Sequence, residues 1–216
     1  MNYFKYLGMF LLLLIFYSCQ TSDKKKTDTI HENMSINETK YAIDTSGVII
    51  VWTAYKFTNK VGVSGSFKNY TLQGNNKSGS VETILNNLKL SILTESVDSK
   101  NTVRDFKLHT YFFKVFNTPT IRGTIINAKE NQGFMKLDMN QNNLKVPYTY
   151  SIKNDTIELF TNLNLNNWNG EKALNALKKE CYDLHTGEDG ISKLWPDVDI
   201  SIKLPLKKTN HYKVHE

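Results

Sequence analysis

Apolar and polar residues alternate along most of the chain beyond residue 40, with the period of two that is typical of β-strands. Met135, Leu137 and Met139, for example, are separated by Lys136 and Asp138. Short polar turns separate many of the alternating stretches, so neighbours in sequence are expected to pair antiparallel. The alternation predicts about eight strands, near residues 48–57, 61–67, 88–92, 120–127, 135–139, 144–152, 157–165 and 198–206.

Each predicted strand has one apolar face, which requires either a sandwich of two sheets or a closed barrel. A barrel removes exposed strand edges. Eight strands also enclose an interior wide enough for side chains or for one small apolar ligand. Pro147 interrupts the strand over residues 144–152. Because proline cannot donate to a sheet ladder, it predicts an edge or a bulge at that point.

Two segments break the alternation and predict short helices. In the first, Thr102 and Asp105 have the spacing of a capping box. The segment continues through Phe106, His109 and Phe113, which recur at helical spacing. The body is therefore predicted to be mainly β, with this segment as a helical insertion.

The second predicted helix covers residues 169–184 and ends before Gly187, a typical stop residue. Cys181 lies on its apolar stripe, so we expect a buried free thiol there. The other members of the stripe are Ala173, Leu174, Leu177 and Leu184.

The first 18 residues have the pattern of a bacterial signal peptide. Lys5 precedes an apolar run over residues 6–17, which is too short for a bilayer that needs about 20 apolar residues. Ser18-Cys19 follows this run and resembles the lipobox, in which the Cys becomes the N-terminus and carries acyl chains. The alternative is an ordinary signal peptide with an incidental Cys19. We expect a lipoprotein anchored through Cys19 in the cell envelope. The favoured location is the outer membrane, on its periplasmic or surface side.

The chain beyond the anchor divides into a tether, a domain and a tail. Residues 19–40 contain few apolar side chains and cannot offset the entropy of ordering, so they predict a flexible tether. Residues 41–208 suit one domain with a sizeable core, and residues 209–216 remain as a short tail.

The charge pattern excludes one class of partner. Lys and Arg number 27 against 21 Asp and Glu, and apart from residues 24–26 they are scattered beside the acidic residues. There is no basic stripe with interleaved aromatic residues, so nucleic acid is not expected as a partner. A mild attraction to anionic membranes is compatible with the net charge of +6.

Five groups of residues carry a resemblance to a known family. They are Tyr41-Ala42-Ile43-Asp44, Val51–Phe57, Val63-Ser64-Gly65-Ser66-Phe67, Arg104-Asp105 with Leu108, Tyr111-Phe112-Phe113 and Pro119-Thr120-Ile121, and Cys181–Gly187 with Lys193-Leu194-Trp195. In their order and spacing they together resemble the YceI-like family of periplasmic and lipoprotein domains, and the last group resembles a variant found in Bacteroidota lipoproteins. The resemblance extends over residues 41–207 and implies a lipocalin-like antiparallel β-barrel that binds a long isoprenoid chain, such as a polyprenyl quinone or polyprenyl phosphate.

Two polar clusters are candidates for chemistry. Cys181 and His185 lie four residues apart with carboxylates nearby, so they could share a helix face and ligate a metal. The favoured interpretation is a buried thiol and a histidine at a helix end, since a structural zinc site needs four ligands. Arg104, Asp105 and His109 could form a polar gate at the barrel mouth, and helix capping with a solvated face is the favoured alternative.

The chain contains no nucleophile elbow, phosphate-binding glycine loop, dinucleotide fingerprint or HExxH motif, so an enzyme is the less favoured class.

The apolar strand faces are the remaining candidates for a binding site. Met and Tyr side chains can line an adaptable apolar pocket, although a fully packed core is the alternative. No cofactor is expected beyond a bound polyprenyl lipid. The functional hypotheses are a lipid-binding or lipid-carrying lipoprotein, a metal-dependent enzyme using Cys181 and His185, or a structural lipoprotein without a ligand. The positions expected to face a ligand are Leu90, Ile92, Met135, Leu137, Val146, Tyr148, Leu159 and Ile200, with Val198 and Ile202 beside them.

Overall fold

The computed structural model describes residues 39–209. The signal peptide, Cys19, nearly all of the tether and the last seven residues lie outside this range. The strands are β1 (Lys40–Ile43), β2 (Ile49–Lys56), β3 (Val61–Phe67), β4 (Tyr70–Gln73), β5 (Lys89–Leu93), β6 (Val97–Asp98), β7 (Thr120–Lys129), β8 (Gln132–Met139), β9 (Asn142–Lys153), β10 (Thr156–Asn164) and β11 (Leu194–Thr209). The helices are α1 (Val81–Leu85), α2 (Thr102–Lys107) and α3 (Glu171–Glu180), with short helical turns η1 (Thr45–Gly47), η2 (Thr94–Ser96), η3 (Leu108–Phe113), η4 (Leu165–Trp168) and η5 (Asp183–His185).

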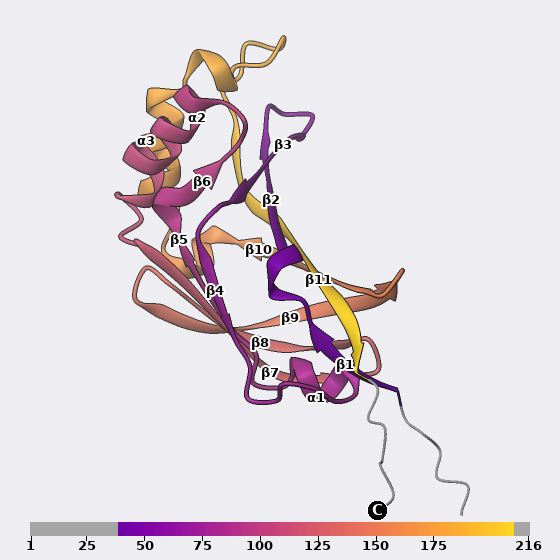
Figure 1. Cartoon of the computed structure of the whole chain (residues 1–216). Helices are drawn as coiled ribbons and strands as arrows, with labels where there is room; N and C mark the ends of the chain where they lie inside the picture. The colour runs from indigo at the N-terminus through magenta and orange to yellow at the C-terminus, as the bar shows by residue number, and fades with distance from the viewer. Residues whose placement is uncertain (1–38, 210–216) are drawn as a thin grey trace, which may run out of the picture. The chain divides into compact units, whose positions relative to one another are not determined.

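The strands pair antiparallel in one sheet that curls around a common core (Figure 1). From β7 to β11 each strand pairs with the next, and β11 pairs with β2, which pairs with β3. β3 and β4 are two halves of one bent strand, as are β5 and β6. Phe67 of β3 pairs with Val97 of β6, and Tyr70 of β4 pairs with Ile92 of β5. These two pairings close the sheet into a barrel. The described strands fill the eight strand positions that the sequence predicted.

Three tight hairpins connect β7 to β10 in sequence. The two central residues of each turn have positive φ, which is the geometry of a type I′ turn and matches the twist of the flanking strands. Asn and Asp tolerate this left-handed backbone better than most residues, and they supply four of the six positions. The turn residues are Glu130-Asn131, Asn140-Gln141 and Asn154-Asp155.

Pro147 opens the sheet between β9 and β10, as predicted. It pairs with Phe134 of β8, but the ladder from β9 to β10 stops at Thr149 and Phe160. Beyond this point the hydroxyl of Thr161 donates to the Pro147 carbonyl over 2.8 Å. The Pro147 carbonyl therefore accepts from a side chain at the point where the backbone ladder to β10 has stopped.

One end of the barrel is solidly packed around α1, a helix too short for its periodicity to be predicted (Figure 1). Ile84 and Leu85 of α1 are buried in the core. Tyr150 of β9 donates to the carboxylate of Glu82 over 3.1 Å. The first strand, β1, and the end of β11 pair at this same end, so both limits of the described chain lie here (Figure 1).

The opposite end carries α2, η3 and α3. The capping box predicted at the start of α2 was one residue out of register. The N-cap is Asn101, whose side chain accepts from the Arg104 N–H over 2.9 Å. Asp105 instead accepts from the N–H and hydroxyl of Ser99 over 2.8 and 2.6 Å. This carboxylate therefore holds the start of the helix against the end of β6.

The apolar stripe predicted for this segment was wrong at Phe106, which is 63% exposed. η3 is a π-helical turn in which the Lys114 N–H donates to the His109 carbonyl, five residues back, over 3.1 Å. The wider turn inserts one residue into the helical repeat. Phe113 thereby comes to the inward side together with Leu108 and Phe112, whereas Phe106, in α2 before the wider turn, faces outward.

The second predicted helix was too long. α3 ends at Glu180, and Cys181 is its C-cap. Ala173, Leu177 and Cys181 are buried as expected, but Leu184 is exposed because it lies beyond the helix, in η5. None of the helices between residues 39 and 209 is long and apolar enough to cross a membrane.

Candidate ligand-binding cavity

A cavity of about 170 Å³ lies inside the barrel, toward the end capped by η3 and α3. Its lining comes from most strands of the barrel and contains no charged side chain. An apolar cavity of roughly 150 Å³ is large enough to hold benzene. The space is therefore sufficient for part of an apolar ligand.

The cavity is long rather than compact. Its wall follows β11 from Leu194 to Leu204, through the alternate positions Val198, Ile200 and Ile202. At the rise of a β-strand this wall is about 30 Å long. A small volume spread over such a length suits a hydrocarbon chain better than a compact ring system.

Two of the few polar groups in the wall are already engaged. The Thr161 hydroxyl donates to Pro147, and the Trp195 Nε1–H donates to the Phe57 carbonyl over 2.7 Å. Within residues 39–209 the buried Trp52 Nε1–H has no acceptor. Its indole ring packs against Gly65, where a Cβ would come within 2.7 Å of Trp52 Cε2. The wall therefore offers the part of a ligand inside the barrel almost exclusively apolar contact.

The helical cap supplies an aromatic end wall. Phe112 and Phe113 meet at a centroid distance of 5.1 Å, and Phe112 and Phe116 at 5.3 Å. All three rings line the cavity together with Leu108. Sequence reasoning missed them as lining residues, although the density of aromatic residues over 111–116 was a usable signal.

Six of the eight predicted ligand-facing positions line this cavity, as do Val198 and Ile202. The other two, Val146 and Tyr148, are buried but belong to the packed core. The Tyr148 hydroxyl donates to the Asn127 carbonyl over 2.9 Å. Burial raises the pKa of this phenol above its ordinary value. The six lining positions are Leu90, Ile92, Met135, Leu137, Leu159 and Ile200.

Cys181 and His185 are close in the chain, since the His185 N–H donates to the Cys181 carbonyl over 3.0 Å. Burial raises the pKa of the Cys181 thiol. Burial also lowers the pKa of His185 to about 4, and Lys56 and Lys178 add to this shift. The described part of the chain contains no cluster of three or more potential metal ligands. The imidazole is therefore neutral and the thiol protonated at neutral pH, and among residues 39–209 the buried His185 Nδ1 has no hydrogen-bond partner.

The second candidate cluster, Arg104, Asp105 and His109, lies in α2 and η3 at the capped end of the barrel. Asp105 is bound to Ser99, and Arg104 has no carboxylate partner among residues 39–209. The capping interpretation therefore accounts for Asp105.

Comparison with known proteins identifies the fold. The family model described as a YceI-like domain matches residues 41–206. BcnA of Burkholderia cenocepacia is 15% identical, with a TM-score of 0.52 over 75% of this chain and 98% of its own. A polyisoprenoid binding domain from Saccharophagus degradans is 12% identical, with a TM-score of 0.54 over 78% of this chain and 98% of its own. At these identities the likeness concerns the fold alone. No curated protein matches the sequence.

Proposed function

The chain belongs to the YceI-like family, and from this premise we propose that its barrel binds and carries an apolar lipid, with an isoprenoid chain as the first candidate. The observation that carries the proposal is the long cavity with an uncharged wall. Hydrocarbon gains most from leaving water for such a wall, whereas a buried charge would lack a partner there. The structurally similar domain from Saccharophagus degradans is described as polyisoprenoid binding, which supports the same ligand class.

The ligand's polar group, if it has one, belongs outside the cavity. The wall holds no free charged side chain that could pair with a phosphate. Trp195 lies at the capped end of the wall, with the ammonium groups of Lys60 and Lys193 over its ring at 5.2 and 4.7 Å. A ligand with an apolar chain inside and a polar head near these lysines would satisfy both environments.

The proposal includes a membrane anchor at Cys19, which would hold the barrel at the cell envelope. Its support is the apolar run over residues 6–17 followed by Ser18-Cys19. Intact-mass analysis of the protein extracted from membranes should find a chain that starts at an acylated Cys19. A chain that starts elsewhere, or an unmodified Cys19, would remove the anchor from the proposal without touching the ligand.

The ligand itself is tested by native mass spectrometry of protein purified without detergent exchange, followed by organic extraction. The expected result is an apolar lipid in stoichiometric amount. Elemental analysis of the same sample tests the rival metal-dependent enzyme: stoichiometric metal, lost in a His185→Ala variant, would favour it. Neither lipid nor metal would favour a structural lipoprotein, and the carrier proposal would then be dropped.

A further inference from the structure

The cavity ends at a defined level on the side of α1. On β11 its wall stops at Leu204, although the next residue on the same face, Leu206, is also buried. The wall stops in the same way at Leu159 of β10, before the buried Ile157, and at Ile125 of β7. Ile157 pairs directly with Leu204 across the sheet. The last residues of the wall therefore lie beside the first residues of the packed end, and the lumen has a floor.

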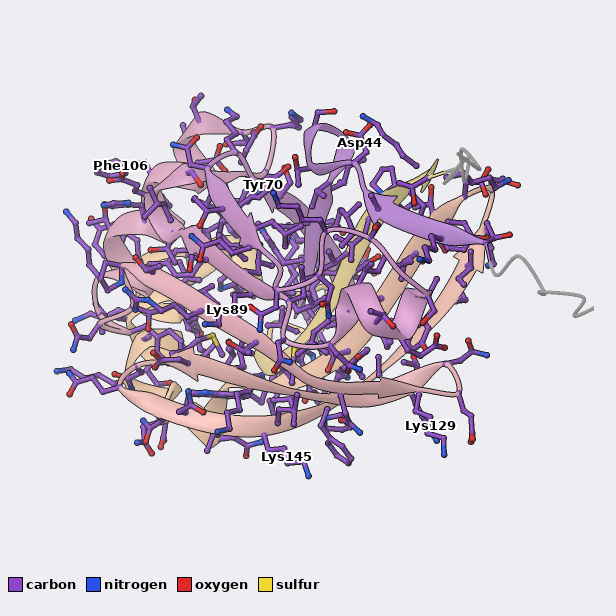
Figure 2. All side chains as sticks on the ribbon, turned by 60° about the horizontal axis from the view of Figure 1, so that its bottom comes forward. Asp44, Tyr70, Lys89, Phe106, Lys129 and Lys145 are labelled. Carbon is purple, nitrogen blue, oxygen red and sulfur yellow. The ribbon has the colours of Figure 1, made fainter. Side chains whose placement is uncertain are left out.

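α1 lies at this floor and closes the lumen. Its Ile84 and Leu85 are 1% and 0% exposed and do not line the cavity. Leu88, which follows the helix, does line it, and its N–H donates to the Leu85 carbonyl over 2.9 Å. The Leu88 carbonyl accepts from the Ile125 N–H over 2.9 Å, which ties the helix to the last wall position of β7. Figure 2, in which this end of the molecule comes forward, shows α1 lying across it, between Asp44 and Lys129 in this view.

Hydrogen bonds to β1, β7 and β9 hold α1 in place. The Glu82 carboxylate accepts from β9, as described above. The Asn86 side chain accepts from the Ala128 N–H of β7 over 2.9 Å. Gly79, just before the helix, exchanges two backbone hydrogen bonds with Tyr41 of β1, over 2.8 and 3.0 Å. The helix cannot withdraw without breaking these contacts, so the depth of the lumen is fixed by packing.

A chain in this lumen has different surroundings at its two ends. The floor is closed and apolar, so a polar terminus there would be buried without a partner. The opposite end of the wall holds Trp195, with Lys60 and Lys193 over its ring. A lipid therefore fits with its apolar tail against the floor and its polar group toward these lysines.

We propose that α1, with Leu88 and Ile157 beside it, sets the longest hydrocarbon chain that the barrel accepts, and that the chain binds with its tail against this floor. The inference rests on the proposed carrier function and narrows its ligand class. That class is a single-chain lipid with an apolar terminus, whose enclosed length is limited to the wall of about 30 Å.

Chain-length selection is measured on the full chain after its lipid has been removed by organic extraction and the protein refolded. The probe is an equimolar mixture of all-trans polyprenols of graded length, from farnesol to decaprenol, and native mass spectrometry identifies each complex by its mass. The parent protein should bind chains up to a sharp limit. Ile157→Ala deepens the lumen beside Leu204 and should move the limit to longer polyprenols. Leu88→Phe raises the floor and should move the limit to shorter ones.

Leu206→Ala is the matched control, because it removes the same number of atoms from the packed end at a position that does not line the cavity. It should leave the limit unchanged, and a shift equal to that of Ile157→Ala would overturn the proposal. The two floor variants act in opposite directions, so either one suffices if the other does not fold. The same limit in the parent and in every folded floor variant would also overturn it.

The orientation of the chain has a test of its own. A polyprenol of permitted length with a second hydroxyl at its far end should bind about tenfold more weakly than the plain polyprenol, since that hydroxyl would be buried without a partner. Equal binding would overturn the tail-first orientation. Failure of the parent to bind any polyprenol would remove the carrier function and the length limit together, whereas binding of every length would remove the length limit alone.

Discussion

Two leucines in the barrel differ in what surrounds them. Leu85 of α1 is completely buried in the packed end, whereas Leu137 of β8 is buried against the cavity. Removing a buried leucine side chain costs about 2–5 kcal/mol, and the cost is highest where the side chain is packed on all sides. We expect Leu85→Ala to approach the upper value, near 5 kcal/mol, and Leu137→Ala the lower one, near 2 kcal/mol, in urea unfolding of the lipid-free protein.

The same two variants separate packing from binding. Bound lipid in the purified protein should fall for Leu137→Ala and stay unchanged for Leu85→Ala, provided both are folded. A loss of stability at Leu137 as large as at Leu85, in protein that never contains lipid, would mean that the lumen is a solid core.

His185 makes stability depend on pH. Its pKa falls from 6.5 to about 4 on folding, mainly because burial disfavours the imidazolium. Between these values the unfolded chain binds more protons than the folded one, so the free energy of unfolding rises with pH and levels off above about 6.5. His185→Gln should flatten this part of the profile, measured as urea midpoints from about pH 4 to 7. An unchanged slope in the variant would assign the pH dependence to other groups.

At the scale of elements, the approach of β3 to β2 requires a glycine. A Cβ at Gly65 would lie 2.7 Å from Trp52 Cε2 and 2.9 Å from the Asp98 carbonyl oxygen. Gly65→Ala should therefore cost about 1–3 kcal/mol, the usual range for overpacking. Gly123 of β7 is the matched control, because the nearest atom to its Cβ position is Leu137 Cδ1 at 3.8 Å. Gly123→Ala should leave the unfolding midpoint nearly unchanged, and a loss equal to that of Gly65→Ala would contradict the packing argument.

The helical cap shows how one local irregularity changes the role of an element. The spacing of Phe106, His109 and Phe113 indicated one apolar stripe, because a regular α-helical repeat would place the three on one face. The π turn of η3 shifts the following residues by one position. As a result, Phe113 lines the cavity together with Leu108 and Phe112, whereas Phe106, in α2 before the π turn, is exposed.

For the whole molecule, a bound lipid should raise thermal stability. A ligand present at 100 times its Kd stabilises the folded state by about 2.7 kcal/mol. Each kcal/mol raises the Tm of a domain of this size by about 2–4 °C. Removing the lipid by organic extraction and refolding should thus lower the Tm by about 5–10 °C, and adding the extracted lipid back should restore it. Identical Tm values with and without lipid would show that the lipid is not bound by the folded barrel.

The sequence by itself determined the architecture, because strand faces and turns are local properties. Alternation of apolar and polar residues identified eight strand positions, and Pro147 marked the opening between β9 and β10. The apolar stripe of α3 predicted the buried thiol of Cys181. The short strand β4 and the helix α1 were not predicted, since four or five residues show too little periodicity to be recognised.

The tertiary structure alone decided which part of the lumen is hollow. Tyr148 and Leu137 both face inward from neighbouring strands, yet Tyr148 is packed and bonded to Asn127, while Leu137 lines the cavity. Alternation reports only on which side of the sheet a side chain lies. Whether that side is filled depends on the volume supplied by distant elements: α1 fills one end of the barrel, and η3 and α3 cover the other while leaving space beneath them.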